Sequence, residues 1–415
     1  MFVYKLTVLT YDKKAKGNKL MINEKMRMLG AKRSVIRETF EYGKRRKAEI
    51  GEDKVFDFSL GNPSVPAPVC VNENLKKLLT DVSPVVLHGY TSAQGDAAVR
   101  SAIADYIKKT QGESVNADCL YMTVGAAAAL TCSLTALASE GEEVIVLAPY
   151  FPEYKVFIER TGAICREVMC HTDTFQPDID AIAAAINEKT AAIIINSPNN
   201  PTGAVMTEES VIALTDLLKK KEAELSKVIY LISDEPYREL VYGGAKVPYL
   251  TKYYNDTLVC YSYSKSLSLP GERIGYVLVS PRMTDFVSVY QAVAGAGRAL
   301  GFVCAPSMLQ RLIPTCLGKT AEVEIYDRNR RILSEKLTEY GYTVVKPDGA
   351  FYLFVKALED DANAFCMRAR DFELLLVASD DFGCKGFVRI SYCVTTEQVE
   401  NSLPAFKALA EAYGK

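Results

Sequence analysis

A chain of 415 residues, 49% of them hydrophobic and 24% charged, can bury a large core, and its length favours two lobes. Its 49 basic and 51 acidic residues give a net charge of -2, which argues against a nucleic acid or a membrane surface as partner. It has only two histidines, and its eleven cysteines form no Cys-x-x-Cys pair, so neither a metal site nor a disulfide framework is supported. Without a long apolar run or a signal peptide pattern, we expect a cytoplasmic protein that binds small molecules.

The first 64 residues are predicted to form an N-terminal arm and part of a small domain. Residues 1–20 show no clear period, which is consistent with a start codon assigned too far upstream. The charged segment from Arg33 to Gly51 is compatible with a helix. The segment from Val55 to Gly61 has the pattern of a strand that runs into a turn.

Residues 65–310 are predicted to form a large domain, because short apolar runs alternate there with segments of helical period. The expected strands are residues 120–124, 143–147, 192–196, 228–233, 258–261 and 275–279. This alternation predicts an α/β fold with a mainly parallel sheet and helices on both faces. Ligands of such sheets bind beyond the carboxyl ends of the strands.

Residues 311–415 are predicted to form a smaller α+β domain together with the N-terminal arm. The long charged segment from Ala321 to Tyr340 has the period of a helix that leads from one lobe to the other. Strands are expected at Gly349 to Leu353 and at Phe387 to Ser391.

Four short stretches stand out between residues 200 and 389. They are Asn200 to Gly203 (Asn-Pro-Thr-Gly), Asp234 to Tyr237 (Asp-Glu-Pro-Tyr), Ser262 to Lys265 (Ser-Tyr-Ser-Lys) with Arg273, and Arg389. Each is common by itself, because Asn-Pro is an ordinary turn and a lysine after a strand is usually solvated. Their joint order and spacing are those that an enzyme of pyridoxal 5'-phosphate needs.

Lys265 is the predicted Schiff-base lysine. A lysine amine can hold a cofactor aldehyde as a reversible imine and later move a proton between substrate carbon and cofactor. The residue follows an expected strand and lies among serine hydroxyls. Ser262, Ser264 and Arg273 are therefore candidates to bind the cofactor phosphate, since hydroxyls and a guanidinium are good phosphate partners.

A second phosphate anchor is expected where Gly125, Ala126 and Ala127 turn a strand into a helix. Backbone N–H groups at the start of a helix bind anions. The alternative is that the glycine and the alanines only allow close packing of the helix on the sheet.

Asp234, at the end of an expected strand, is the predicted carboxylate that keeps the pyridine nitrogen protonated. Tyr237 and Asn200 are candidates to hydrogen-bond the phenolic oxygen of the ring and lower the proton affinity of the imine. Phe151 is expected to stack on the ring, with Tyr150 as the second choice and a core role as the alternative.

Arg389 is the predicted anchor of the substrate's alpha-carboxylate, because a guanidinium fixes a carboxylate in a plane. It lies between Val388 and Ile390 on an expected strand, where a purely structural arginine would find few partners. A structural ion pair is the alternative.

With these motifs the chain resembles the class I/II aminotransferases, the fold type I superfamily of pyridoxal-phosphate enzymes that includes aspartate, alanine and aromatic aminotransferases. The resemblance covers roughly residues 30–415. Besides the four stretches, it rests on Gly61-Asn62-Pro63 and on Tyr90 followed by Gly95 and Arg100.

The resemblance implies a homodimer with shared active sites, in which Tyr90 reaches the phosphate of the neighbouring subunit's cofactor. It also implies that the arm and the small lobe close over substrate, with the backbone of Gly61 and Asn62 beside Arg389. Arg298 lies near where aspartate-type members place an arginine for the distal carboxylate of the other subunit's substrate, although a surface arginine is the alternative. The stacking residue is often tryptophan in those members, whereas this chain has none and offers Phe151.

The implied reaction is transfer of the amino group of an aspartate-like amino acid, alanine or an aromatic amino acid to a 2-oxo acid such as 2-oxoglutarate, in two half-reactions through Lys265. A carbon-sulfur beta-lyase is the nearest alternative, because the same fold and lysine also serve eliminating enzymes. A ligand-sensing protein without catalysis is the more distant alternative.

Overall fold

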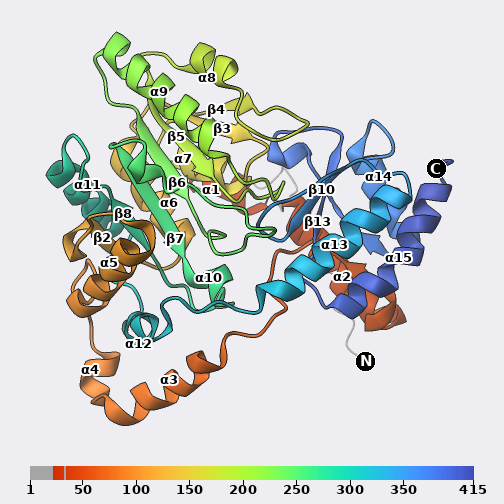
Figure 1. Cartoon of the computed structure of the whole chain (residues 1–415), viewed down its shortest axis with the longest axis horizontal. Coiled ribbons are helices and arrows are strands. Elements are labelled where there is room, and N and C mark those ends of the chain that lie inside the picture. Colours follow the sequence, from red (N-terminus) through yellow and green to blue (C-terminus); the bar gives the residue numbers. More distant parts are fainter. Residues whose placement is uncertain (1–21, 32–33) are drawn as a thin grey trace, which may run out of the picture.

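The computed structural model describes residues 22–31 and 34–415, and a seven-stranded sheet lies at its centre (Figure 1). Along the sheet the strands have the order β2-β8-β7-β6-β5-β3-β4. Their bounds are β2 Leu120–Thr123, β3 Glu143–Ala148, β4 Ile164–Met169, β5 Thr190–Asn196, β6 Tyr230–Asp234, β7 Thr257–Ser262 and β8 Gly275–Val279. Only β8 runs against the others, so the predicted mainly parallel sheet is confirmed.

The sequence analysis missed one strand of this sheet, β4. It lies at the sheet edge, where it pairs only with β3. Its sequence Ile-Cys-Arg-Glu-Val-Met has most of its side chains partly or fully exposed. The central strands, by contrast, are buried on both faces and give the continuous apolar runs that were recognised.

Helices cover both faces of this sheet (Figure 1). One face packs against α6 Ala126–Leu137, α7 Glu153–Arg160 and α11 Phe286–Ala299. The other packs against α5 Ala97–Gln111, α8 Ile179–Ala185, α9 Glu208–Leu225 and α12 Ser307–Leu312. Helix α3 Val69–Asp81 packs against α12. The short helices α1 Glu24–Ala31, α4 Pro84–His88 and α10 Tyr263–Ser266 complete this part of the chain.

A second, smaller sheet has the order β12-β13-β10-β9 and is antiparallel throughout. Its strands are β9 Val344–Val345, β10 Tyr352–Lys356, β12 Val377–Ala378 and β13 Phe387–Ser391, and its helices are α13 Val323–Glu339, α14 Ala362–Ala369 and α15 Thr396–Glu411. We call this part the small lobe and the part built on the seven-stranded sheet the large lobe. The predicted boundaries at residues 64 and 310 stay a prediction.

The strand expected at Gly349 to Leu353 begins later, at Tyr352. The preceding backbone is used for contacts with the large lobe, because the Gly349 N–H donates to the Gly203 carbonyl at 2.9 Å and the Ala350 N–H donates to the Leu240 carbonyl at 2.9 Å. Ala350 also adopts a left-handed φ of 55°, which does not belong to an extended strand. This turn joins the two lobes beside the site described below.

The N-terminal helix α2, Val35–Ile50, packs against the small lobe, although it is far from it in sequence (Figure 1). The predicted start at Arg33 and the interpretation of residues 1–20 lie outside the described residues. The strand expected at Val55 to Gly61 is shorter, because only β1 Phe56–Asp57 pairs, with β11 Leu374–Leu375. The chain from Ser59 to Gly61 is thereby free to offer its carbonyl groups to other side chains.

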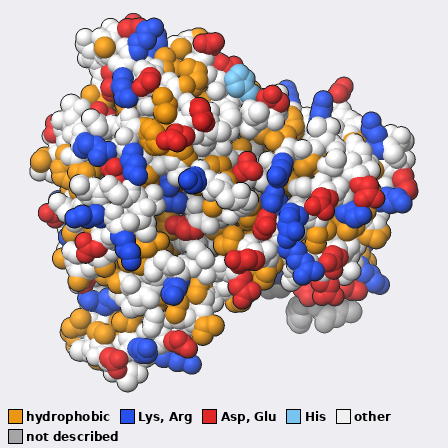
Figure 2. Space-filling view, viewed as in Figure 1, with side chains coloured by type: hydrophobic (Ala, Val, Ile, Leu, Met, Phe, Trp, Pro, Cys, Tyr) orange, Lys and Arg blue, Asp and Glu red, His pale blue; other side chains and the backbone are white. Residues whose placement is uncertain are grey.

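In the described part of the chain, none of the helices combines the length and the hydropathy that a transmembrane span requires. The face drawn in Figure 2 carries acidic and basic side chains mixed with each other, without a large area of one sign. This mixture agrees with the small net charge of -2.

Candidate active site

A cavity of about 550 Å³ lies between the two lobes, at the carboxyl ends of β5, β6 and β7. This is the edge at which open parallel sheets bind ligands. Predicted site residues line it from both lobes: Gly61, Ala126, Ala127, Phe151, Asn200, Asp234, Tyr237, Ser262, Ser264, Lys265, Arg273 and Arg389. Residues that are up to 328 positions apart in sequence, from Gly61 to Arg389, therefore face one space.

Lys265 projects into this cavity from α10, the single helical turn that follows β7. Its Nζ donates to the Gly61 carbonyl at 2.7 Å and lies 5.2 Å from the centre of the Phe351 ring. Burial, followed by the positive charges of Arg389 and Arg273, lowers the pKa of Lys265 to about 8. The lowered pKa increases the fraction of neutral amine near neutral pH to about a tenth, and the neutral amine is the nucleophile.

Asp234 ends β6 and is buried beneath the same cavity. Its Oδ2 accepts a hydrogen bond from the Tyr154 hydroxyl, while its Oδ1 has no partner among the described residues. Burial raises the pKa of Asp234 to about 7, and the Tyr154 hydrogen bond opposes this. An unpartnered buried carboxylate oxygen fits a protonated ring nitrogen, which would supply both the missing hydrogen bond and a positive charge.

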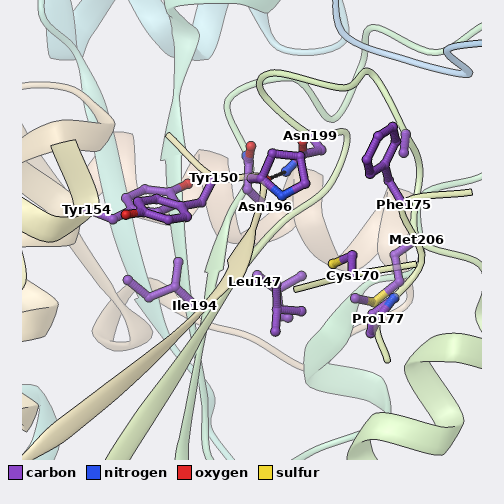
Figure 3. Close-up of a pocket in the computed structure, with 13 residues that line it drawn as sticks. Leu147, Tyr150, Tyr154, Cys170, Phe175, Pro177, Ile194, Asn196, Asn199 and Met206 are labelled. Atoms are coloured by element: carbon purple, nitrogen blue, oxygen red, sulfur yellow. Dashed lines mark hydrogen bonds between the residues drawn. The ribbon is translucent and has the colours of Figure 1, made fainter. Parts of the chain in front are cut away.

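The residues that hold Asp234 lie around a second cavity of about 30 Å³ (Figure 3). Figure 3 shows the rings of Tyr150 and Tyr154 next to each other, stacked with centroids 6.4 Å apart. The Asn196 side chain donates to the Asp234 carbonyl at 2.9 Å and accepts from the Asn200 N–H at 2.7 Å. Tyr154 therefore positions Asp234, and Asn196, which lines both cavities, positions Asp234 and Asn200.

The groups that were predicted to bind the cofactor phosphate lie together in the cavity wall and next to it. The Ser262 and Ser264 hydroxyls are 2.6 Å apart. Gly125, with φ 86°, caps α6, and a Cβ built on it would lie 2.8 Å from a guanidinium nitrogen of Arg273. A side chain at this position would crowd the Arg273 guanidinium, so glycine allows it to lie close to the start of the helix. A guanidinium next to the N–H groups of a helix start suits a phosphate group.

Arg389 is only 2% exposed and is held by both lobes. It donates to the Asn200 Oδ1 at 3.0 Å and to the Ser59 carbonyl at 2.6 Å, and its guanidinium lies 4.7 Å from the centre of the Tyr352 ring. Its Nε has no partner among the described residues. These neutral partners leave the positive charge uncompensated, and a substrate carboxylate would neutralise it.

The phenol groups of Tyr237 and Tyr352 are 2.8 Å apart at the cavity wall. Burial raises the pKa of both, so both are neutral at physiological pH. A side chain on Gly61 would collide with the Tyr352 hydroxyl, so this glycine allows the arm to approach the site closely. The sequence analysis did not select Tyr352, since it expected only a strand residue there.

Phe151 lines the cavity and packs edge-on against Tyr154 with centroids 5.7 Å apart. Tyr150, the second choice for stacking, faces the smaller cavity and donates to Glu167 at 3.0 Å (Figure 3). The structure therefore places the phenylalanine, and not the tyrosine, in the wall of the active-site cavity.

Four predicted residues do not line the cavity, and besides Gly125, which caps α6 next to it, they are Tyr90, Arg298 and Asn62. Tyr90 is 91% exposed on the loop after α4, Arg298 is exposed near the end of α11, and Asn62 is exposed beside Gly61. The roles expected for Tyr90 and Arg298 involve the neighbouring subunit, so a single chain leaves them as predictions. Asn62 does not line the cavity that Gly61 lines.

Tyr154, Asn196 and Tyr352 contact the predicted site residues but were not found from the sequence. Asn196 had a usable signal, because it ends an apolar strand exactly as Asp234 ends the next one. Tyr154 lies within an ordinary amphipathic helix, and Tyr352 lies on a strand among other aromatic residues, so neither stands out without the fold.

The site fits pyridoxal 5'-phosphate on its own observations. It contains a partly buried lysine amine, a buried carboxylate oxygen without a partner among the described residues, and a glycine-capped helix start with two serines and an arginine. Lys265, Asp234, Phe151 and the Ser262–Arg273 group are the residues that would hold the aldehyde, the ring nitrogen, the ring face and the phosphate.

Comparison with solved structures defines the class of protein. The structure is similar to an amino transferase from Eubacterium rectale, with a TM-score of 0.94 and 56% identity over 96% of this chain and 100% of that one. It is also similar to the aspartate aminotransferase of Thermus thermophilus with maleate, with a TM-score of 0.83 and 27% identity over 94% of this chain and 100% of that one. The chain therefore has the aspartate aminotransferase fold.

The chain belongs to the family of class I and II aminotransferases, whose family model matches residues 53–406. It is 31% identical to the aspartate aminotransferase of Thermotoga maritima over 89% of this chain and 95% of that protein. It is 29% identical to the aspartate/prephenate aminotransferase of Thermus thermophilus over 83% and 88%, respectively. The predicted resemblance is confirmed, and the protein is an enzyme of a family that uses pyridoxal phosphate.

Proposed function

We propose that this protein uses pyridoxal 5'-phosphate to move the amino group of an L-amino acid, aspartate-like, alanine or aromatic, to a 2-oxo acid such as 2-oxoglutarate. The observation that carries the proposal is the meeting of Lys265, the unpartnered Oδ1 of Asp234 and the buried Arg389 at one cavity. The relatives named above support it, since their names include aspartate and prephenate as substrates.

When bound, the cofactor supplies an aldehyde that exchanges between amines and a ring that accepts the electron pair released from the substrate's alpha-carbon. Asp234 holds the proton on the ring nitrogen, and Arg389 orients the substrate through its alpha-carboxylate. The Lys265 amine, once displaced by the substrate amine, takes the proton from the alpha-carbon. Two such half-reactions, one with the donor amino acid and the other in reverse with the acceptor 2-oxo acid, complete a ping-pong cycle.

We also propose a homodimer in which Tyr90 of one subunit completes the phosphate site of the other. The extreme exposure of this tyrosine, 91% in the single chain, supports a partner surface around it. Arg298, which is likewise exposed, is a second candidate to reach the neighbouring site.

Incubation with single substrates distinguishes transfer from elimination. We expect keto acid to form from aspartate, alanine or phenylalanine only when 2-oxoglutarate is present, together with equimolar glutamate. Pyruvate and ammonia formed from cystathionine without an acceptor would instead identify a carbon-sulfur beta-lyase. A protein with no turnover on either set would favour the ligand-sensing alternative.

The lysine assignment has its own test. Borohydride should fix the cofactor on the peptide that contains Lys265, and the Lys265→Ala variant should lose turnover while it keeps its fold. Turnover that survives in this variant, or a label on another lysine, contradicts the assignment.

A further inference from the structure

A third cavity, of about 420 Å³, lies in the large lobe between α5 and the loop that follows β6. We call it the α5 cavity. No residue lines both this cavity and the active-site cavity. Its volume is in the range of small-molecule sites. Its wall is rich in aromatic side chains, namely Tyr106, Tyr249, Tyr261, Tyr263 and Tyr276.

Glu239 brings a carboxylate to this aromatic wall. Its Oε1 accepts a hydrogen bond from the Tyr261 hydroxyl at 2.9 Å. Its Oε2 is buried and has no hydrogen-bond partner among the described residues. A buried carboxylate oxygen without a donor costs free energy, and an N–H group of a cation would supply both the missing hydrogen bond and the opposite charge.

Arg238, the neighbour of this carboxylate in sequence, is engaged elsewhere. Its Nε donates to Glu235, and its two other nitrogens donate to the carbonyl groups of Val247 at 3.1 Å and Pro248 at 3.3 Å. Its guanidinium lies 4.8 Å from the centre of the Tyr249 ring. Arg238 therefore fixes the loop that forms one side of the α5 cavity and leaves Glu239 without an ion pair.

Lys246 is the other basic side chain in this wall. It is exposed, and it makes no ion pair with any residue in 22–31 or 34–415. Its position places a positive charge where the cavity opens to solvent. A ligand with a second cation at its outer end would therefore be repelled.

Tyr249 adds a second polar atom without a partner. Its side chain is only 4% exposed, and its buried hydroxyl makes no hydrogen bond within the described part of the chain. This hydroxyl oxygen can accept from an N–H group. Ile103 and Ile107 of α5 are buried and supply aliphatic surface to the same wall. A carboxylate, a hydroxyl and aromatic rings around an apolar space are the groups that recognise an organic cation.

The α5 cavity is built on the elements that also carry the active site. Tyr263 is the first residue of α10, the helical turn that holds Lys265. The Tyr261 hydroxyl, which donates to Glu239, also lies 3.0 Å from the Ser266 Oγ. The two cavities are therefore back to back across α10, and the wall of the second is held by the framework of the first.

We propose that the α5 cavity binds a small alkylammonium ion, whose N–H group donates to the Oε2 of Glu239 and whose alkyl groups pack on the tyrosine and isoleucine side chains. The ligand carries a single positive charge, because Lys246 repels a second one. This site goes beyond the proposed function, and its test does not depend on turnover.

The first test measures binding of N,N-dimethylbutylamine by calorimetry on the cofactor-loaded protein. This probe is a tertiary amine, so it forms no imine with a cofactor aldehyde. We expect one site per chain and a Kd of about 1 mM, since the ligand has few atoms. Butyltrimethylammonium has the same charge but no N–H group, and its Kd should be about tenfold higher.

The second test uses matched variants to locate the site. In Glu239→Gln the Kd of the tertiary amine should rise about tenfold or more. Glu153, at the start of α7, lines the active-site cavity, so Glu153→Gln should keep the Kd within about twofold. Tyr249→Phe keeps the ring and should raise the Kd about threefold. Thermal midpoints equal to that of the wild-type protein show that the variants are folded, and Tyr249→Phe decides the matter if Glu239→Gln does not fold.

Four results would overturn the inference. They are no binding of the tertiary amine up to about 50 mM, a Kd that rises in Glu153→Gln and not in Glu239→Gln, equal affinity for the probe without an N–H group, and a Lys246→Ala variant that binds about tenfold more tightly. The last result would show that the ammonium group of Lys246 itself occupies the cavity in solution.

Discussion

Burial of Asp234 favours its protonated form, whereas its proposed role requires the ionised carboxylate. Burial raises its pKa from 3.8 to about 7 in the protein without cofactor, and Tyr154 satisfies only one of its two oxygens. A carboxylate in this position costs stability when it is ionised and unpaired. The cost is offset when a protonated ring nitrogen binds to the free oxygen.

We therefore expect the difference in free energy of unfolding between the wild-type apoprotein and its Asp234→Asn variant to depend on pH. Between pH 3.8 and about 7 the native state keeps a proton that the unfolded state releases, so the stability of the wild-type protein falls as the pH rises through about 7. From about pH 5.5 to about pH 8.5, it should lose about 2 kcal/mol relative to the variant. Urea unfolding at both pH values measures this difference.

The activity of Asp234→Asn should fall relative to that of the wild-type protein. Because the amide carries no charge to hold a proton on the ring nitrogen, turnover of the loaded variant should fall by at least about 100-fold. An apoprotein whose stability relative to the variant stays constant over this pH range would contradict the pKa argument. Unchanged turnover would contradict the role of Asp234.

At the scale of elements, the local sequence indicated where the ligand-binding edge lies. Asp234 and Lys265 were recognised because each directly follows an apolar run that is a central strand of the sheet. Such strands are buried on both faces, and this burial produces a continuous hydrophobic signal. Edge strand β4 has no such signal, because its exposed side chains include charged residues.

Contacts between elements that are far apart in sequence could not be predicted in this way. Tyr352 approaches the site because its strand pairs with β13, which carries Arg389, in the small lobe. Arg37 lines the cavity because α2 packs on β11, more than 300 residues away in sequence. The sequence pattern predicts α2 as a helix, but it does not say which face meets the cavity.

The junction between β2 and α6 gives a prediction at this scale. Gly125 adopts φ 86°, and a Cβ on it would lie 2.8 Å from the Arg273 guanidinium. The variant Gly125→Ala therefore both strains the backbone and displaces Arg273 from the start of the helix. We expect the Kd for pyridoxal 5'-phosphate to rise by at least about tenfold, measured by fluorescence titration of the apoprotein.

Gly141 gives a matched control for this variant. It also has a positive φ, 80°, but nothing lies within 4 Å of a Cβ built on it. Gly141→Ala should therefore cost a comparable backbone strain without any change in cofactor affinity. Equal effects of the two variants on the Kd would show that backbone strain alone, and not the contact with Arg273, sets the affinity.

At the scale of the whole molecule, the segment that contains α3 and α4 extends away from both lobes (Figure 1). It exposes large apolar side chains: Val69 is 74% exposed, Leu79 58%, Val85 82%, Val86 50% and Tyr90 91%. Apolar side chains gathered on one segment mark a surface that another chain covers. These exposures support the proposed dimer, with Tyr90 at its edge.

Mixing two inactive variants tests whether Tyr90 acts across subunits. In a hybrid of Tyr90→Ala and Lys265→Ala chains, one site combines the intact Lys265 of the first chain with the intact Tyr90 of the second, and the other site carries both defects. Random exchange of equal amounts should therefore recover about a quarter of the wild-type activity, since half of the dimers are hybrids with one intact site each. If Tyr90 served its own subunit, each chain would carry one defect into its own site, and the mixture would show only the average of the two parent variants.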